Sequence, residues 1–268
     1  MKIIVCVKHV PDATADRRFA DDGTVDRVGV DGLLSELDEY AVEQSLQVKE
    51  RVDDSTLTVL TVGPEQATDA IRKSLQMGAD KGVHVLDDAI AGSCALSTSL
   101  VLAEAVKKIG AEDGWDLVVC GMASTDGSMG VLPSMLAERL GVPAVTLGSA
   151  VEVVDGPDGG LVRIRRDGDV ATETIEGSLP LVLSVTDQSG EARYPSFKGI
   201  MAAKKKPLQT WSLADLGVDA ELVGLSAASS VVETTQARPP RTAGEVVTDQ
   251  DGSGATALVE FLAAKKFI

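Results

Sequence analysis

The chain has 268 residues, with 25 Lys and Arg against 41 Asp and Glu, and a formal net charge of −16. Such a charge repels polyphosphate backbones, and only 3% of the residues are aromatic, so a nucleic-acid-binding function is excluded. Cys6, Cys94 and Cys120 are far apart and the histidines are unpaired, which predicts no disulfide framework, no metal site and a reducing, cytoplasmic location.

No run in the sequence approaches the ~20 apolar residues that a membrane-spanning helix needs, so membrane insertion is not expected. The first residues already read as a strand, which leaves no room for a targeting peptide.

Short apolar runs alternate with segments of helical period over the first 143 residues. Strands are predicted at 3–7, 57–62, 82–86 and 116–120, and helices at 36–51, 65–78, 96–109 and 129–140. Nearly unbroken apolar strands that alternate with helices are typical of a parallel sheet covered on both faces. Right-handed crossovers then bring the loops after each strand to one carboxyl edge.

The pattern changes after residue 143. Segments 144–154, 161–166 and 170–175 read as strands, separated by Gly-Pro-Asp-Gly-Gly at 156–160 and by an Asp-Gly turn, which favours antiparallel hairpins. The predicted fold class is therefore α/β, a doubly wound and mostly parallel sheet with antiparallel hairpin additions.

The C-terminal residues differ from the rest of the chain. Arg-Pro-Pro-Arg-Thr at 238–242 predicts a hinge, and 254–266 predicts a short helix with an apolar stripe. A lone amphipathic helix of this length is marginal in water unless it docks, either on its own domain or on a partner chain. We therefore expect an α/β domain at 1–235 and a C-terminal arm at 236–268.

The first candidate site is the segment 121–132, which joins the fourth predicted strand to its helix. Its Gly, Ser and Thr residues place backbone NH groups at a helix N-terminus, where the helix dipole also favours an anion such as a nucleotide phosphate. Asp126 is interpreted either as an ordinary N-cap or as a residue that orients the loop. A capping box is predicted from Ser35 and Asp38 at the start of helix 36–51.

The common nucleotide motifs are missing from the sequence. There is no G-x-x-x-x-G-K-[ST], and no G-x-G-x-x-G follows the first strand. Because no Ser/His/Asp or Cys/His arrangement lies near these loops either, binding is favoured over hydrolysis. A nucleotide-hydrolysing or nucleotide-sensing enzyme of the same fold remains the alternative.

The second candidate site is the segment 191–207, which follows an apolar strand at 181–185. This loop, interrupted by Pro and Gly, carries Phe197, Met201 and three consecutive lysines, a combination that a buried core does not require and that predicts a displayed contact surface. The alternatives are that Phe197 packs inward and that the lysines form a solvated run, hold the loop in place or meet an acidic partner.

Motifs along the whole chain resemble those of electron-transfer flavoprotein beta subunits. They include Val-Lys-His-Val-Pro-Asp at 7–12 and the segments 39–43, 77–82, 121–132, 193–207, 215–218 and 240–244. The resemblance implies a fold like that of the adenine-nucleotide alpha hydrolases and a heterodimer whose alpha subunit holds redox-active FAD. It also implies a structural AMP in this chain and no catalysis by the chain itself.

The resemblance further implies electron transfer from acyl-CoA and other dehydrogenases towards the quinone pool through a quinone oxidoreductase. Phe197 falls where family members commonly place a leucine that enters a pocket of the dehydrogenase. The partner-docking residues are Tyr194, Pro195, Phe197, Ile200, Met201, Lys204, Lys205 and Lys206. The C-terminal arm is expected to dock on the alpha subunit.

The AMP contacts implied by position come from the ends of three strands and the start of one helix. They are Cys6, Val7, Lys8, Ser35, Glu36, Leu37, Asp38, Val62, Gly63, Cys120, Gly121, Met122, Ala123, Ser124, Thr125, Asp126, Gly127, Ser128, Met129, Gly130, Val131 and Leu132. Some relatives carry Asp, Asn, Gln and Thr where this chain has Gly127, Gly130, Val131 and Leu132, so backbone donors must dominate here. Because a second FAD replaces AMP in electron-bifurcating relatives, that cofactor remains an alternative.

Overall fold

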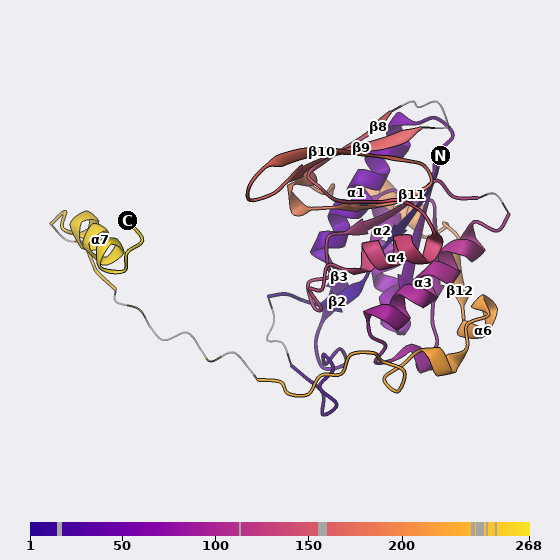
Figure 1. Cartoon of the computed structure of the whole chain (residues 1–268), viewed down its shortest axis with the longest axis horizontal. Helices are drawn as coiled ribbons and strands as arrows, with labels where there is room; N and C mark the ends of the chain where they lie inside the picture. Colours follow the sequence, from indigo (N-terminus) through magenta and orange to yellow (C-terminus); the bar gives the residue numbers. More distant parts are fainter. Residues whose placement is uncertain are drawn as a thin grey trace. The chain divides into compact units, whose positions relative to one another are not determined.

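The structure is a computed structural model, and it describes residues 1–14, 18–112, 114–154, 160–236, 239, 244, 246–249 and 251–268 (Figure 1). The predicted hinge at 238–242 and turn at 156–160 lie outside the described residues, apart from Pro239 and Gly160, as does the motif at 240–243. The chain divides into two compact units, Met1–Thr234 and Thr235–Ile268.

Within the described residues of the first unit, seven strands form one sheet in the order β12-β5-β4-β1-β6-β11-β7, and each neighbouring pair is parallel. The strands are β1 (Lys2–Cys6), β4 (Thr56–Val62), β5 (Lys81–Val85), β6 (Leu117–Gly121), β7 (Ala144–Gly148), β11 (Leu181–Val185) and β12 (Leu208–Trp211). Every residue of β6 and β11 is buried, as expected for central strands covered on both faces. The predicted α/β class is confirmed.

Helices cover both faces of this sheet. They are α1 (Glu36–Arg51), α2 (Thr68–Met77), α3 (Ala95–Ile109) and α4 (Leu132–Leu140). Because side chains alternate along a strand, Ile3 and Val5 pack with α1 and α2, whereas Ile4 packs with α3 and α4. Each fully buried Ile or Leu stabilises the fold by roughly 1.5–3 kcal/mol. These two cores therefore fix the positions of the strands and of the loops that follow their carboxyl ends.

Two smaller antiparallel sheets complete the first unit. One has the order β10-β9-β8, formed by β8 (Ala150–Val154), β9 (Leu161–Asp167) and β10 (Thr172–Ser178), and the other pairs β2 (His9–Pro11) with β3 (Gly32–Leu34). The prediction of one strand at 144–154 is wrong. Leu147 has a φ of +65° near the end of β7, where the pairing with β11 shifts register, and β8 begins at Ala150 in the antiparallel sheet.

Two predicted helix starts are also wrong. The helix predicted from 129 begins at Leu132, because Ser128 and Gly130 have φ values of +51° and +66°, which a right-handed helix excludes. The helix predicted at 65–78 is a short 3₁₀ turn, η1 (Glu65–Ala67), followed by α2.

Short elements complete the first unit. They are the 3₁₀ turns η2 (Asp88–Ile90), η3 (Asp187–Ser189) and η4 (Ala220–Leu222) and the helices α5 (Phe197–Ala203) and α6 (Leu213–Leu216). Among the described helices of both units, none combines the length and the apolar character that crossing a membrane requires.

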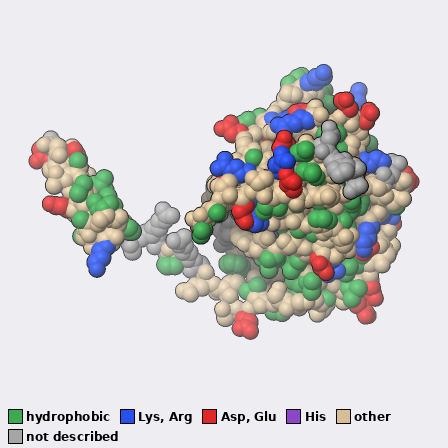
Figure 2. All heavy atoms as spheres, turned by 45° about the horizontal axis from the view of Figure 1, so that its top comes forward, with side chains coloured by type: hydrophobic (Ala, Val, Ile, Leu, Met, Phe, Trp, Pro, Cys, Tyr) green, Lys and Arg blue, Asp and Glu red, His purple; other side chains and the backbone are tan. Residues whose placement is uncertain are grey.

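The second unit contains α7 (Gly254–Ala264), which matches the helix predicted at 254–266 except for its last two residues. No residue of α7 is buried, and Leu258, Val259 and Phe261 are each about half exposed. Figure 2 shows apolar side chains gathered along one side of this helix. An apolar face of this kind is stable in water only when another surface covers it.

Candidate functional site

The carboxyl ends of β1 and β6 meet the first turn of α1 at one point. The amide of Lys8 donates to Asp38 Oδ2 at 2.8 Å, and the amide of Gly121 donates to the same carboxyl group. A Cβ on Gly121 would lie 2.5 Å from Asp38 Oδ1 and 2.7 Å from the carbonyl oxygen of Leu37, so only glycine allows this approach. The structure therefore brings 6–8, 35–38 and 120–121 together.

The capping box predicted from Ser35 and Asp38 is wrong. Ser35 is the N-cap residue of α1, but its hydroxyl makes no capping bond, because the Asp38 carboxyl turns towards β1 and β6. Ser35 is fully buried, and among the described residues its Oγ has no hydrogen-bond partner. A buried hydroxyl in this condition costs free energy and marks a place where a ligand or water is expected.

Burial raises the pKa of the Asp38 carboxyl to about 7. The amide and ammonium of Lys8 and the amide of Gly121 oppose this rise, whereas the charge of Asp126 adds to it. The first turn of α1 therefore holds a carboxyl that is partly protonated near neutral pH.

Asp126 points into the protein rather than capping α4. Its carboxylate contacts Lys8 Nζ at 3.0 Å and the guanidinium of Arg27, and it accepts the amide of Gly127 at 2.7 Å. Burial favours the neutral acid, but the Lys8 charge, Ser124 and Arg27 hold the pKa of Asp126 well below its usual range. Since the N-cap of α4 is Val131, the N-cap interpretation of Asp126 is wrong.

The amides at the end of the loop differ from that of Ser128. Ser128 donates to the carbonyl of Ser124 at 2.9 Å, but the amides of Met129, Gly130, Val131 and Leu132 make no hydrogen bond within the described chain. These four NH groups precede and begin α4, where the helix dipole adds to their attraction for an anion.

The other residues implied at the AMP site lie at the same sheet edge or beneath it. Val62 ends β4, next to β1, and Gly63 follows it and contacts His84 and Val85. Cys6 and Cys120 lie side by side in the core, and the contact between them together with burial raises the pKa of Cys120 well above its usual value. Their thiols belong to the hydrophobic core beneath the loop 121–132.

The segment 191–207 is more ordered than the loop predicted there, because 197–203 form α5. Ser196 caps this helix by accepting the amide of Gly199 at 3.0 Å. Phe197 is 82% exposed and Tyr194 94% exposed, so the interpretation that Phe197 packs inward is wrong. Ile200 and Met201 extend the same exposed apolar surface.

Polar contacts, one of them to the buried Glu43, hold this segment against α1 and α2. Arg193 pairs with Glu43 at 2.7 Å and with Glu50 at 2.5 Å, and Lys206 Nζ donates to the carbonyl of Leu75 at 2.8 Å. Lys206 therefore fixes the segment, whereas Lys204 and Lys205 are exposed. The half-buried Pro195 lies in the sequence between Arg193 and the start of α5.

Sequence reasoning missed Arg27, Arg193 and Glu43. Glu43 carried a usable signal, since it is a charged residue beside the apolar stripe of a predicted helix and needs a buried cation. Arg27 carried none, because the connection between β2 and β3 has neither periodicity nor a motif.

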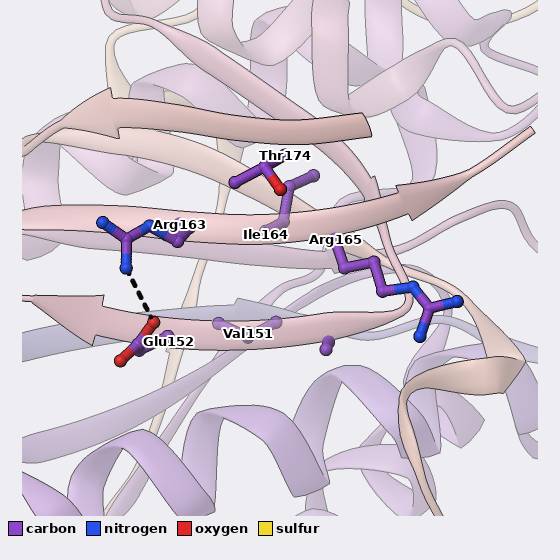
Figure 3. Close-up of a pocket in the computed structure, with 7 residues that line it drawn as sticks. Val151, Glu152, Arg163, Ile164, Arg165 and Thr174 are labelled. Atoms are coloured by element: carbon purple, nitrogen blue, oxygen red, sulfur yellow. Dashed lines mark hydrogen bonds and ion pairs between the residues drawn. The ribbon is translucent and has the colours of Figure 1, made fainter. Parts of the chain in front are cut away.

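A shallow depression of about 180 Å³ lies elsewhere, on the sheet β8–β9–β10 (Figure 3). Arg163 on β9 points towards Glu152 on β8 and pairs with it at 3.2 Å, and Arg165 pairs with Asp167. Since the charged groups along it already neutralise one another, we do not assign a ligand to this depression.

The described residues form an α/β domain with unpaired loop amides at the carboxyl ends of its strands and an exposed apolar surface on α5. The electron transfer flavoprotein domain family matches residues 22–216. The electron transfer flavoprotein subunits beta of Mycobacterium bovis and Mycobacterium leprae are 44% and 45% identical to this chain, each aligned over 99% of both chains. The caffeyl-CoA reductase-Etf complex subunit CarD of Acetobacterium woodii is 33% identical over 92% of both chains.

The chain belongs to the electron transfer flavoprotein family, and its relatives identify it as a beta subunit that serves electron transfer.

Proposed function

We propose that this chain is the AMP-binding and partner-docking half of a heterodimeric electron carrier whose alpha subunit holds FAD. The proposal rests on family membership and, in the chain itself, on the exposed Phe197 at the start of a capped and anchored helix. FAD supplies the electron chemistry when bound, and AMP supplies none. A cytoplasmic location is part of the proposal.

The residues at the sheet edge fit an adenine mononucleotide. The unpaired amides at 129–132 suit a phosphate, and the orphan hydroxyl of Ser35 offers a further polar contact at the neighbouring helix start. The inward carboxylate of Asp126 opposes an anion, but Lys8 and Arg27 compensate its charge. The chain's own residues thus bind and orient the nucleotide without any proton transfer.

Docking of dehydrogenases is assigned to Tyr194, Phe197, Ile200 and Met201. Exposed aromatic side chains on a rigid element are typical anchors of interfaces, because they bury a large area at little cost in conformational entropy. Acyl-CoA dehydrogenases are the proposed electron donors and a quinone oxidoreductase the acceptor. Contacts of this kind are small and exchange rapidly, as a shuttle between two enzymes requires.

The apolar face of α7 is assigned to the alpha subunit. Leu258, Val259 and Phe261 are exposed within their own unit, so a partner surface is the proposed cover. Burying such side chains stabilises the heterodimer by the same hydrophobic term that stabilises a core.

A second candidate function follows from one relative. The 33% identical CarD is named as a subunit of a caffeyl-CoA reductase complex, which favours a role in a stable complex with a reductase, with FAD in place of AMP. The two functions differ in the cofactor that this chain would carry.

Co-expression with the alpha subunit, denaturation and chromatography of the released nucleotides tests the proposal. One AMP and one FAD per heterodimer support it, and two FAD support the second function. A heterodimer that releases no nucleotide other than one FAD, or that hydrolyses ATP, refutes the AMP assignment.

A further inference from the structure

One carboxylate at the sheet edge holds two cations from separate parts of the chain. Lys8 follows β1, Arg27 lies between β2 and β3, and both contact Asp126 in the loop after β6. The Asp126 side chain is only 3% exposed, whereas those of Lys8 and Arg27 are 43% and 34% exposed. The two cations therefore converge on a buried group and remain accessible from outside.

The charges in this cluster do not balance. Lys8 and Arg27 carry two positive charges against the single charge of Asp126. Asp38 is the other acid near Lys8, and its pKa of about 7 leaves it partly neutral near pH 7. The neighbouring acid Asp26 stays ionised, but its carboxylate accepts the amides of Val28 and Gly29 instead of pairing with Arg27. The two cations therefore share one contacting carboxylate, that of Asp126.

Asp126 also occupies donors that suit an external anion. Its Oδ1 accepts the amide of Gly127 at 2.7 Å and Lys8 Nζ at 3.0 Å, so the carboxylate combines a loop amide with two cations. A phosphate requires the same set of donors, and the unpaired amides at 129–132 follow in the same loop. Asp126 thus behaves as an internal anion.

We propose that Lys8 and Arg27 are the charge-recognising ligands of the nucleotide phosphate, and that Asp126 holds both in position until the phosphate shares them. This inference rests on the proposed nucleotide-binding function and adds Arg27, which lies far from the phosphate loop in sequence. It assigns recognition to the phosphate rather than to the adenine or ribose.

The test is binding of AMP and of adenosine to the heterodimer after removal of its nucleotide, measured by calorimetry at low and high salt. Arg27→Gln should weaken AMP binding by about tenfold, because a charge-assisted contact is lost, and leave adenosine binding unchanged. Arg27→Lys should restore part of the affinity. Arg18→Gln, in the same connection and exposed, is the matched control and should bind like the unchanged protein.

The loss caused by Arg27→Gln should also shrink at high salt, because screening weakens the contact that it removes. Equal AMP affinity in Arg27→Gln and the unchanged protein overturns the inference but leaves the proposed function intact. Equal losses for AMP and adenosine also overturn it, since they indicate a structural role. A heterodimer that binds neither compound refutes the proposed function itself.

Discussion

Arg193 and Glu43 join the docking segment to α1 through both backbone and side chain. The amide and Nε of Arg193 donate to Glu43 Oε2 at 3.1 and 2.7 Å, and Nη2 donates to Oε1 at 3.0 Å. Burial disfavours the Glu43 carboxylate, but these bonds keep its pKa below its usual value. The chain therefore enters α5 from a fixed point.

Arg193→Gln should lower the free energy of unfolding by about 1–3 kcal/mol, because it leaves the buried Glu43 carboxylate without its cation. Chemical denaturation measures the loss, and limited proteolysis should show new cleavage near 191–207. The control is Arg72→Gln, which breaks an exposed pair with Asp69 and should cost less than about 0.5 kcal/mol. Equal losses in both variants would contradict the anchoring role.

Phe197→Ala should reduce kcat/KM for electron transfer from the dehydrogenase by about tenfold or more, because it removes the exposed anchor. Stopped-flow reduction of the flavin measures the rate. Heterodimer yield, flavin spectrum and stability should not change, since the side chain is 82% exposed. Leu222→Ala, another exposed apolar residue, is the control, and unaltered rates in Phe197→Ala would remove Phe197 from the interface.

Asp38 should make stability depend on pH. Its pKa is about 7 in the folded chain against an ordinary 3.8, so the folded state keeps a proton that the unfolded state loses. Stability from this group is therefore present at acid pH and falls as pH rises towards 7, by at most about 1.4 kcal/mol per pH unit. Lys8, Asp126 and Cys120 face the carboxyl and shape this range.

Asp38→Asn should remove that slope between pH 4.5 and 7, as measured by urea denaturation at successive pH values. Asp69→Asn, an exposed acid on α2, is the control and should retain it. The assignment fails if Asp38→Asn and the unchanged chain show parallel curves.

Truncation after Thr234 should leave the first unit folded and weaken assembly with the alpha subunit, because it removes α7 and its exposed apolar face. Circular dichroism of the truncated chain and the yield of copurified alpha subunit measure the two effects. Undiminished copurification would assign α7 another role.

The parallel sheet could be predicted because its strands are continuous apolar runs separated by helical periods. The end of β7 could not be predicted, since Leu147 adopts a positive φ that its side chain does not favour, and Gly148 lies against Ile164 of β9, a contact that no local pattern shows. Likewise, the glycines of the loop 121–132 are visible in the sequence, but the inward-turned Asp126 pairs with Arg27, almost a hundred residues earlier. Local patterns give the elements, whereas long-range ion pairs decide which polar groups meet.

The helix α1 contributes to both candidate sites. Asp38 in its first turn closes the sheet edge, and Glu43, five residues later, anchors Arg193, so about 7.5 Å of helix axis separates the two contacts. A side chain at Gly121 would displace the first turn of α1. Because Glu43 lies on the same helix, that displacement would also move Arg193, which leads into α5 and Phe197. The proposed nucleotide site and the proposed docking surface therefore share one helix, and a shift at one end of it is transmitted to the other.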